Sequence, residues 1–200
     1  INILHLRDSP WFDGPGRTIV ETGRRMDAGR YNYYVAGLVR PGETSNPFLD
    51  EARRRGCRTL AIPERSGLDR RALAELRRLV CELDIHVLHG HEFRSNLMTL
   101  LCRPGRPLLR VTTAHGWIAN NLRSRLYVGL DKLLIRFFDE SIAVSHRIER
   151  DLRAWGVPSS RLHVIHNALM LKDFRPASGD ASFREELGVG PDTAVLVNIG

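Results

Sequence analysis

Short apolar runs that stop abruptly at polar or imidazole-bearing residues alternate with helix-forming segments along this chain. One run ends at His89-Gly90-His91, a second at Thr113-Ala114-His115-Gly116, and a third is contained in Phe138–Ser145. The carboxyl edge of a parallel sheet has this pattern, and open α/β folds bind their ligands at that edge. The pattern therefore predicts both an architecture and the place of a site.

Strands and helices are expected in strict alternation. Strands are predicted at residues 1–6, 33–39, 59–62, 85–89, 108–113, 141–144 and 162–165. Helices are predicted from about residue 18, from Asn46-Pro47 to Gly56, around 73–83, and over 95–101, 121–137 and 145–155. Parallel strands need crossovers, which helices usually supply. We therefore predict a doubly wound, mainly parallel α/β sheet with helices on both faces.

The predicted domain covers residues 1–176 and has a Rossmann-like order of elements. After Phe174-Arg175-Pro176 the composition shifts to Ala, Ser, Gly and Asp, which is typical of a linker. A short helix at 182–187 and a strand at 194–199 follow. We expect residues 177–200 to be a linker and the first strand of a second domain that this chain lacks.

Composition limits the function classes. The hydrophobic share of 42% and charged share of 26% are those of a soluble globular chain. Three scattered cysteines argue against a disulfide framework and favour a reducing cytoplasm. The net charge of +7 allows an anionic partner. Its basic residues are spread along the chain without a nucleic-acid-binding module, so no nucleic-acid partner is predicted.

The glycine-rich segment Gly14-Pro15-Gly16 follows the first predicted strand. Its backbone amides could approach a phosphate at a helix start, and the alternative is a plain tight turn. The segment is not a GxGxxG motif, because Arg17 and Thr18 follow it, and it is not a Walker loop. Its place at the carboxyl edge favours contact with a ligand.

His86, His89 and His91 raise the question of a metal site. Alternate residues of a strand share a face, so His89 and His91 can converge while His86 points elsewhere. Zinc needs a third or fourth ligand at workable spacing, and Glu92 is the nearest one. We expect no metal and no cofactor; packing at a strand end or contact with a polar ligand is the favoured interpretation.

His115 is the candidate catalytic residue. It ends an apolar strand, and Gly116 after it permits close approach of a substrate. A neutral imidazole there can exchange a hydrogen bond with a hydroxyl group. The alternative is a structural histidine at the sheet edge. No nucleophile motif of the G-x-S-x-G type accompanies it, so a hydrolase triad is not supported.

The predicted helix 121–137 carries an apolar stripe beside a row of basic side chains. The stripe consists of Leu122, Leu126, Leu130, Leu133, Leu134 and Phe137, and the row of Arg125, Lys132 and Arg136. The favoured interpretation is a core helix with a solvated edge. The alternative is an edge that meets anionic lipid headgroups or a phosphate-bearing acceptor.

Taken together, these segments resemble the N-terminal half of retaining glycosyltransferases of the GT-B fold, family 4. The matching segments, in order, are Gly14–Gly16, Leu88–His91, Thr113–Gly116, Glu140–Ser145, Arg161–Asn167, Phe174–Pro176 and Val195–Gly200. They cover nearly the whole chain.

The resemblance implies a sugar transferred with retention from a nucleotide-sugar donor to a lipid-linked or saccharide acceptor, without a catalytic metal. It also implies a role in cell-envelope or extracellular polysaccharide synthesis. The implied location is the cytoplasm, with peripheral binding to the inner face of the cell membrane. His115 matches the histidine that faces the transferred sugar. The other substrate-contacting positions implied are Gly14, Gly16, Arg17, His89, His91, Gly116, Ser145 and Asn167.

Three departures from the family pattern stand out. Gly-Pro-Gly-Arg replaces the usual Gly-Gly followed by Glu, Asn167-Ala168 replaces Asn-Gly, and the donor-binding residues of the second domain would lie after Gly200. We therefore expect this chain alone to be inactive. The alternatives are a sugar-nucleotide 2-epimerase, which needs additional acids in this half, and a non-enzymatic flavodoxin-like binding module.

Overall fold

The computed structural model describes residues 1–43, 45–65, 69–117, 119–168, 181–190 and 192–196. The chain divides into a compact unit, Ile1–Asn167, and a small second unit, Ala168–Gly200. No helix among the described residues is long and apolar enough to cross a membrane.

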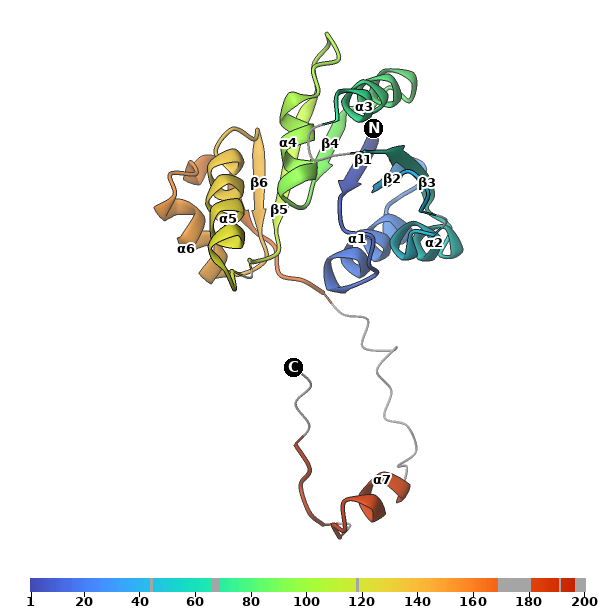
Figure 1. Ribbon diagram of the computed structural model, residues 1–200, viewed down its shortest axis with the longest axis vertical. Helices are drawn as coiled ribbons and strands as arrows, with labels where there is room; N and C mark the ends of the chain where they lie inside the picture. The colour runs from blue at the N-terminus through green and yellow to red at the C-terminus, as the bar shows by residue number, and fades with distance from the viewer. Residues whose placement is uncertain (44, 66–68, 118, 169–180, 191, 197–200) are drawn as a thin grey trace. The chain divides into compact units, whose positions relative to one another are not determined.

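A seven-stranded sheet forms the centre of the first unit (Figure 1). Its strands are β1 (Asn2–Arg7), β2 (Asn32–Val39), β3 (Arg58–Pro63), β4 (Val87–Gly90), β5 (Leu109–Ala114), β6 (Glu140–Ala143) and β7 (Leu162–Val164). All six pairings are parallel, and the spatial order is β3-β2-β1-β4-β5-β6-β7. The predicted parallel α/β sheet is confirmed, and each of its seven predicted strands is present within two residues of the expected ends.

Helices lie on both faces of this sheet, as predicted. They are α1 (Gly14–Arg25), α2 (Pro47–Arg54), α3 (Arg70–Glu82), α4 (Phe93–Leu101), α5 (Leu122–Ile135) and α6 (His146–Ala154), with a 3-10 turn at Ser159–Arg161. Helices α1 and α2 pack on the face of β2 that carries Tyr33 and Val35. Helices α3 and α4 pack on the opposite face, which carries Ala36 and Leu38. Alternation along a strand separates these two sets of side chains.

The strand order reverses between β1 and β4. The chain proceeds from β1 outward to β2 and β3, then returns to place β4 on the other side of β1. The two crossovers leave this point in opposite directions, so a crevice opens at the carboxyl ends of β1 and β4. Arg7 and Gly90 are the last residues of these strands, and the crevice is the expected place for a ligand.

Helix α1 begins at Gly14 rather than near residue 18. Asp13 caps it, because its side chain accepts a hydrogen bond from the Gly16 amide, and Pro15 occupies the first turn. The glycine-rich segment is therefore the first turn of a helix rather than a free loop. Helix α2 begins as predicted, with Asn46 as its cap and Pro47 in its first turn.

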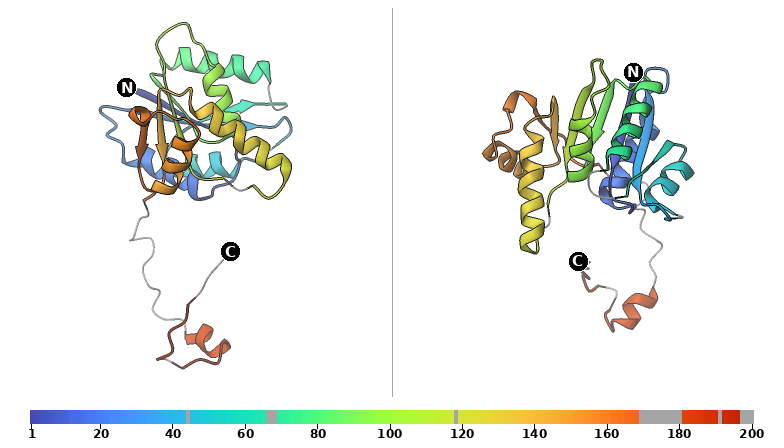
Figure 2. Two further views of the ribbon diagram at one scale, coloured as in Figure 1. Left: turned by 90° about the vertical axis from the view of Figure 1, so that its left-hand side faces the viewer. Right: turned by 45° about the horizontal axis from the view of Figure 1, so that its top comes forward.

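The favoured interpretation of α5 as a core helix with a buried leucine stripe is wrong. Leu122 is 84% exposed, Leu126 63% and Phe137 65%. The helix instead buries Asp131 and Ile135, which lie one turn apart on its other side. Both views in Figure 2 show α5 (yellow) on the outside of the first unit. Amphipathic spacing predicts that the apolar face of a helix meets the sheet, and in α5 that face is exposed instead.

The second unit holds helix α7 (Ala181–Glu186). Arg184 closes the turn after it by donating hydrogen bonds to the carbonyl groups of Gly190 and Thr193. The strand expected at 194–199 is not formed over residues 194–196, and the rest of it lies outside the described residues. The expected boundary at residue 176 also falls outside them.

Candidate functional site

A cavity of about 430 Å³ opens at the carboxyl edge, beside the point where the strand order reverses. It is lined by Arg7, Ser9, Asp13, Pro15, His91, Glu92, Phe93, Ala114, His115, Gly116, Trp117, Ser124, Tyr127, Val128 and Asp131. These residues come from the ends of β1, β4 and β5 and from helices α1, α4 and α5. Apolar walls with a few convergent polar groups are typical of a small-molecule site.

Arg7 organises one wall of this cavity although only 1% of its side chain is exposed. Its guanidinium donates to both carboxylate oxygens of Asp13, at 2.8 and 2.7 Å, to Glu92 at 2.7 Å and to the Trp11 carbonyl at 2.8 Å. Burial alone would lower the pKa of Arg7, but the carboxylates of Glu92 and Asp13 outweigh it and raise that pKa. Arg7 therefore stays charged and fixes the starts of α1 and α4.

Gly16 is required because Arg7 lies against it. A Cβ atom at Gly16 would stand 2.4 Å from a guanidinium nitrogen of Arg7 and 3.2 Å from the Phe48 ring, whereas one at Gly14 would meet nothing within 4 Å. The Gly16 amide already donates to Asp13 at 3.0 Å, so it is not free to bind a phosphate. The lack of a side chain at Gly16 leaves the space that the Arg7 guanidinium occupies.

Gly16→Ala is therefore expected to lower the free energy of unfolding by about 2 kcal/mol, the usual cost of overfilling a packed site. Gly14→Ala is the matched control, in the same helical turn but in open space. Denaturant unfolding of both variants measures the difference. Equal stability of the two would mean that Arg7 can move aside without cost.

Four imidazoles stack at the same edge of the sheet. His5 of β1, His89 of β4 and His91 after it have ring centroids 4.4 to 5.0 Å apart, and His115 stacks on His91 at 5.4 Å. His5 and His91 share a hydrogen bond of 2.8 Å, and His91 and His115 one of 3.1 Å. His89 bonds instead to the Thr113 hydroxyl at 2.8 Å.

Each of these imidazoles is held neutral. Burial lowers the pKa of His89 to about 3, with a smaller effect from His115. Burial and the nearby His89 lower the pKa of His5 and that of His91 well below the usual value. Burial, and secondarily Arg7, lowers the pKa of His115 to about 4. The cluster therefore offers polar nitrogens without positive charge at neutral pH.

His5, His89 and His91 together have the composition of a metal site, with one ring nitrogen from each within 4.8 Å of the others. Their arrangement is unsuited to one ion. The His89 and His91 rings are stacked with an interplanar angle of 16°, and those of His5 and His91 with 24°. The lone pairs lie in the ring planes, so those of stacked rings do not converge on one point. Nitrogens of all three rings are also already engaged in hydrogen bonds.

The opposite wall of the cavity carries a buried carboxyl group on α5. Asp131 accepts hydrogen bonds from the Trp117 indole and the Asn96 amide, both at 2.8 Å. Asn96 in turn accepts one from the Thr112 hydroxyl of β5 at 2.9 Å. Burial raises the pKa of Asp131 despite these bonds. Each carboxylate oxygen has a partner, so Asp131 serves here to hold Trp117 over the cavity.

The structure brings three of the predicted site residues to the cavity, namely His91, His115 and Gly116, the last with φ of 106°. The other predicted residues do not line it. Gly14 is exposed, Gly16 packs on Arg7, Arg17 lies 5.9 Å from the Phe12 ring, His89 is buried below the rim, Ser145 caps α6 and Asn167 is exposed. Their assigned contacts with a substrate stay predictions.

Sequence reasoning missed His5, Arg7, Asp13 and Asp131 as members of the site. A signal existed for Arg7 and Asp13, because a charged residue that ends a buried strand must find a partner within the next loop. A signal for His5 also existed, since it is an imidazole within an apolar strand. No sequence signal indicated Asp131, because the leucine face of its helix, not the face that carries Asp131, was expected to be buried.

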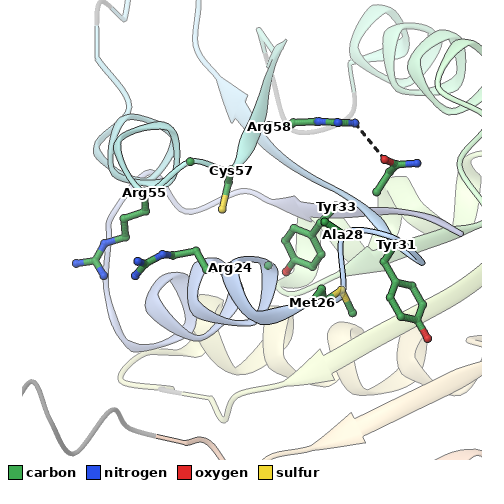
Figure 3. Close-up of a pocket in the computed structure, with 11 residues that line it drawn as sticks. Arg24, Met26, Ala28, Tyr31, Tyr33, Arg55, Cys57 and Arg58 are labelled. Atoms are coloured by element: carbon green, nitrogen blue, oxygen red, sulfur yellow. Dashed lines mark hydrogen bonds between the residues drawn. The ribbon is translucent and has the colours of Figure 1, made fainter.

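A second cavity, of about 330 Å³, lies at the opposite edge of the sheet, where β2 and β3 begin (Figure 3). Arg24, Arg55 and Cys57 border it. Both arginines are already paired with Glu21, and Arg55 also with Glu51. Burial raises the pKa of the Cys57 thiol, which makes it less reactive. Arg58 also lines it, and its guanidinium bonds only to the neutral side chains of Asn32 and Tyr34. This cavity therefore has one cation without a carboxylate partner, but no activated nucleophile, among its described residues.

A family model described as Glycosyltransferase Family 4 matches residues 12–172. A crystal structure of Anabaena Alr3699/HepE in complex with UDP-glucose matches 94% of this chain and 50% of its own, with a TM-score of 0.74 and 15% identity. Sucrose-phosphate synthase (tll1590) from Thermosynechococcus elongatus matches 96% of this chain and 54% of its own, with a TM-score of 0.67 and 15% identity.

A UDP-N-acetylglucosamine 2-epimerase is also similar, over 84% of this chain and 48% of its own, with a TM-score of 0.57 and 13% identity. A search of curated protein sequences gave no match. The chain thus spans about half the length of the solved structures that it resembles. At these identities the structures establish the shared fold, and they confirm the expected GT-B type of N-terminal domain.

Proposed function

Because this chain belongs to glycosyltransferase family 4, we propose that it is the acceptor-side half of an enzyme that transfers a hexose from a nucleotide-sugar donor with retention. The cavity beside His115 carries this proposal. It lies at the carboxyl edge where the strand order reverses, and its polar groups are neutral imidazoles and fixed carboxyl groups. Such groups suit a polyhydroxylated sugar, which needs both donors and acceptors.

The donor diphosphate requires positive charge that this cavity does not offer. Its one buried cation, Arg7, is already bonded to Asp13 and Glu92. The half of the enzyme outside this chain would therefore supply the groups that hold the diphosphate. For the same reason the 200-residue chain alone is expected to bind a nucleotide sugar weakly and not to turn it over.

The direct test is mass spectrometry, with ¹H nuclear magnetic resonance for the anomeric configuration, of the products that the complete enzyme forms from a panel of nucleotide sugars, with UDP-glucose included because the similar HepE structure contains it. The panel is offered with membrane lipid extract and with soluble saccharides as acceptors. Transfer of a hexose, with the new linkage in the anomeric configuration of the donor, supports the proposal. Hydrolysis only, or an isomerised nucleotide sugar, contradicts it.

We further propose that the acceptor is lipid-linked. A third cavity, of about 580 Å³, adjoins the cavity beside His115 and shares Phe93, Ser124 and Tyr127 with it. Arg94 and Arg123 also line it. Arg94 is paired with Glu64, so the guanidinium of Arg123, which has no ion pair among the described residues, is the group offered to an acceptor phosphate at the beginning of α5.

That exposed face fits an anionic bilayer. The stripe is 39 to 84% exposed and consists of Leu122, Leu126, Leu130 and Leu133 of α5 and of Phe137, two residues after its end. Exposed arginines, Arg123, Arg125 and Arg136, accompany it. Lys132, which was expected in this basic row, is instead paired with Asp151 at 2.6 Å and covers Trp117. Leucines flanked by arginines are typical of helices that lie in a membrane interface.

Exchanging Leu122 and Leu126 together for glutamine is expected to lower the partition coefficient onto phosphatidylglycerol-containing vesicles by about 100-fold. Each leucine side chain that no longer enters the bilayer reduces the binding free energy by about 1.5 kcal/mol. Leu101→Gln, an exposed leucine on α4, is the matched control and should bind as the parent does. Vesicle co-sedimentation measures this. Unchanged binding of the double variant would exclude α5 as the membrane contact.

The 2-epimerase alternative receives one structural argument, since Asp13, Glu92 and Asp131 all line the cavity with His115. Each of these carboxyl groups is already bonded, however, to Arg7 or to Trp117 and Asn96. None is left free among the described residues to move a proton on a sugar. We therefore retain the transferase.

A further inference from the structure

Three imidazoles from neighbouring strands form a continuous hydrogen-bonded chain that ends at the cavity. Nδ1 of His5 lies 2.8 Å from Nε2 of His91, and Nδ1 of His91 lies 3.1 Å from Nε2 of His115. Strands β1 and β4 pair directly, as do β4 and β5, so the sheet fixes the three rings in this order. Both ring nitrogens of His91 are used, and no solvent-exposed group intervenes.

A proton count limits the states of this chain. A neutral imidazole carries one N–H, and each nitrogen-to-nitrogen bond needs one N–H and one bare nitrogen. Both bonds can therefore form in only two arrangements of the neutral chain. Either all three rings carry the proton on Nε2, or all three carry it on Nδ1. The tautomer of one ring dictates those of the other two.

The end of the chain at the cavity selects between these arrangements. Nδ1 of His115 is buried and has no hydrogen-bond partner among the described residues. An unpaired buried N–H is rarer in proteins than an unsatisfied acceptor. A bare Nδ1 at His115 is therefore favoured, and with it the arrangement in which all three rings carry their proton on Nε2.

We propose that His5 and His91 are positioning residues that set the tautomer of His115 and so make its Nδ1 a hydrogen-bond acceptor. Nδ1 is buried in the free protein, so a ligand reaches it only after neighbouring groups move, and a ligand hydroxyl that then donates to it fits the protonation of the chain. A ligand group that accepts from His115 would require all three rings to change together, with one proton gained at Nδ1 of His115 and one released from Nε2 of His5. The identity of such a ligand as a sugar rests on the proposed function.

Nuclear magnetic resonance of the uniformly ¹⁵N-labelled chain tests the proposal directly, because bare and protonated ring nitrogens give separate ¹⁵N resonances. The expected spectrum has Nε2–H forms of His5, His91 and His115. It also has nitrogen-to-nitrogen couplings across the His5–His91 and His91–His115 hydrogen bonds. Absence of either coupling, or an Nδ1–H form of His115 in the free protein, would overturn the proposal.

Variants at His5, the ring farthest from the cavity, test whether a change there alters the tautomer of His115. His5→Phe keeps a ring stacked on Tyr33 but removes the acceptor for His91 Nε2, and should shift the ¹⁵N resonances of His115 toward the Nδ1–H form. His5→Asn, whose amide oxygen can accept, should restore the parent spectrum, and His86→Phe at an exposed position is the control. Unchanged His115 resonances in folded His5→Phe would refute the coupling. The readout needs no sugar transfer, so a failed transferase assay would leave this result standing.

Discussion

Replacing Arg7 by methionine is expected to lower the free energy of unfolding by about 3 kcal/mol, the typical cost of removing one partner of a buried ion pair. The guanidinium is almost fully buried and donates to Asp13, Glu92 and the Trp11 carbonyl. Methionine fills part of the volume but donates nothing. The carboxyl groups that cap α1 and α4 then lose their common partner, and the cavity loses one wall.

Denaturant titration followed by circular dichroism measures this change. Arg53→Met is the matched control, because the ion pair of Arg53 with Asp50 is exposed on both sides, and exposed pairs contribute little. No measurable change is expected there. If Arg7→Met were as stable as the control, the bonds of Arg7 to Asp13 and Glu92 would not contribute to the stability of the fold.

The dependence on pH provides a second readout of the same site. Burial, and then the neighbouring Asp8 carboxyl, raise the pKa of Glu92 to about 8, while Arg7 opposes the rise. A carboxyl group with a raised pKa binds its proton more tightly in the folded protein, so its contribution to stability is lost as pH rises from about 4.5 to about 8. Arg7→Met removes the opposing charge, so the pKa of Glu92 should rise further and the loss of stability should extend to higher pH.

The fold was predictable because the information lies in local pattern. Apolar runs, the Asn46-Pro47 helix start and the alternation of elements each specify short segments, and the right-handed crossover rule joins them into one sheet. The start of α1 was misplaced because the glycines suggested a loop. Asp13 and Pro15 carried the correct signal, a cap followed by a first-turn proline.

The site was predictable only where its residues end strands. His91, His115 and Gly116 follow β4 and β5 and come together because parallel strands end at one edge. The partners of Arg7 depend on side-chain packing between β1, α1 and α4, which no local pattern encodes. The orientation of α5 places Asp131 in a buried hydrogen-bond network with Asn96 and Trp117, which no local pattern in the sequence indicates.

The apolar face of α5 lies on the same helix that borders the cavity beside His115. The third cavity, of about 580 Å³, begins at Arg123 and Tyr127, within the first turns of the same helix whose leucines are exposed. A bilayer bound to that face would present a lipid-linked acceptor at the entrance of the site. An exposed stripe that is unfavourable for a soluble domain is then explained by the location of the substrate.

The other large effect is expected at His115. In the complete enzyme, His115→Ala should lower kcat by about 10²-fold or more, as the loss of one well-placed hydrogen bond to a transition state does, with little change in KM for the donor. The imidazole is neutral and lines the cavity, and its Nε2 is occupied by His91, so Nδ1, once neighbouring groups move to uncover it, is the nitrogen left for a sugar hydroxyl. Steady-state kinetics with the active nucleotide sugar measures the effect. His163→Ala, an exposed histidine on β7, should keep parental turnover. Parental turnover by His115→Ala itself would reduce the residue to a structural element of the sheet edge.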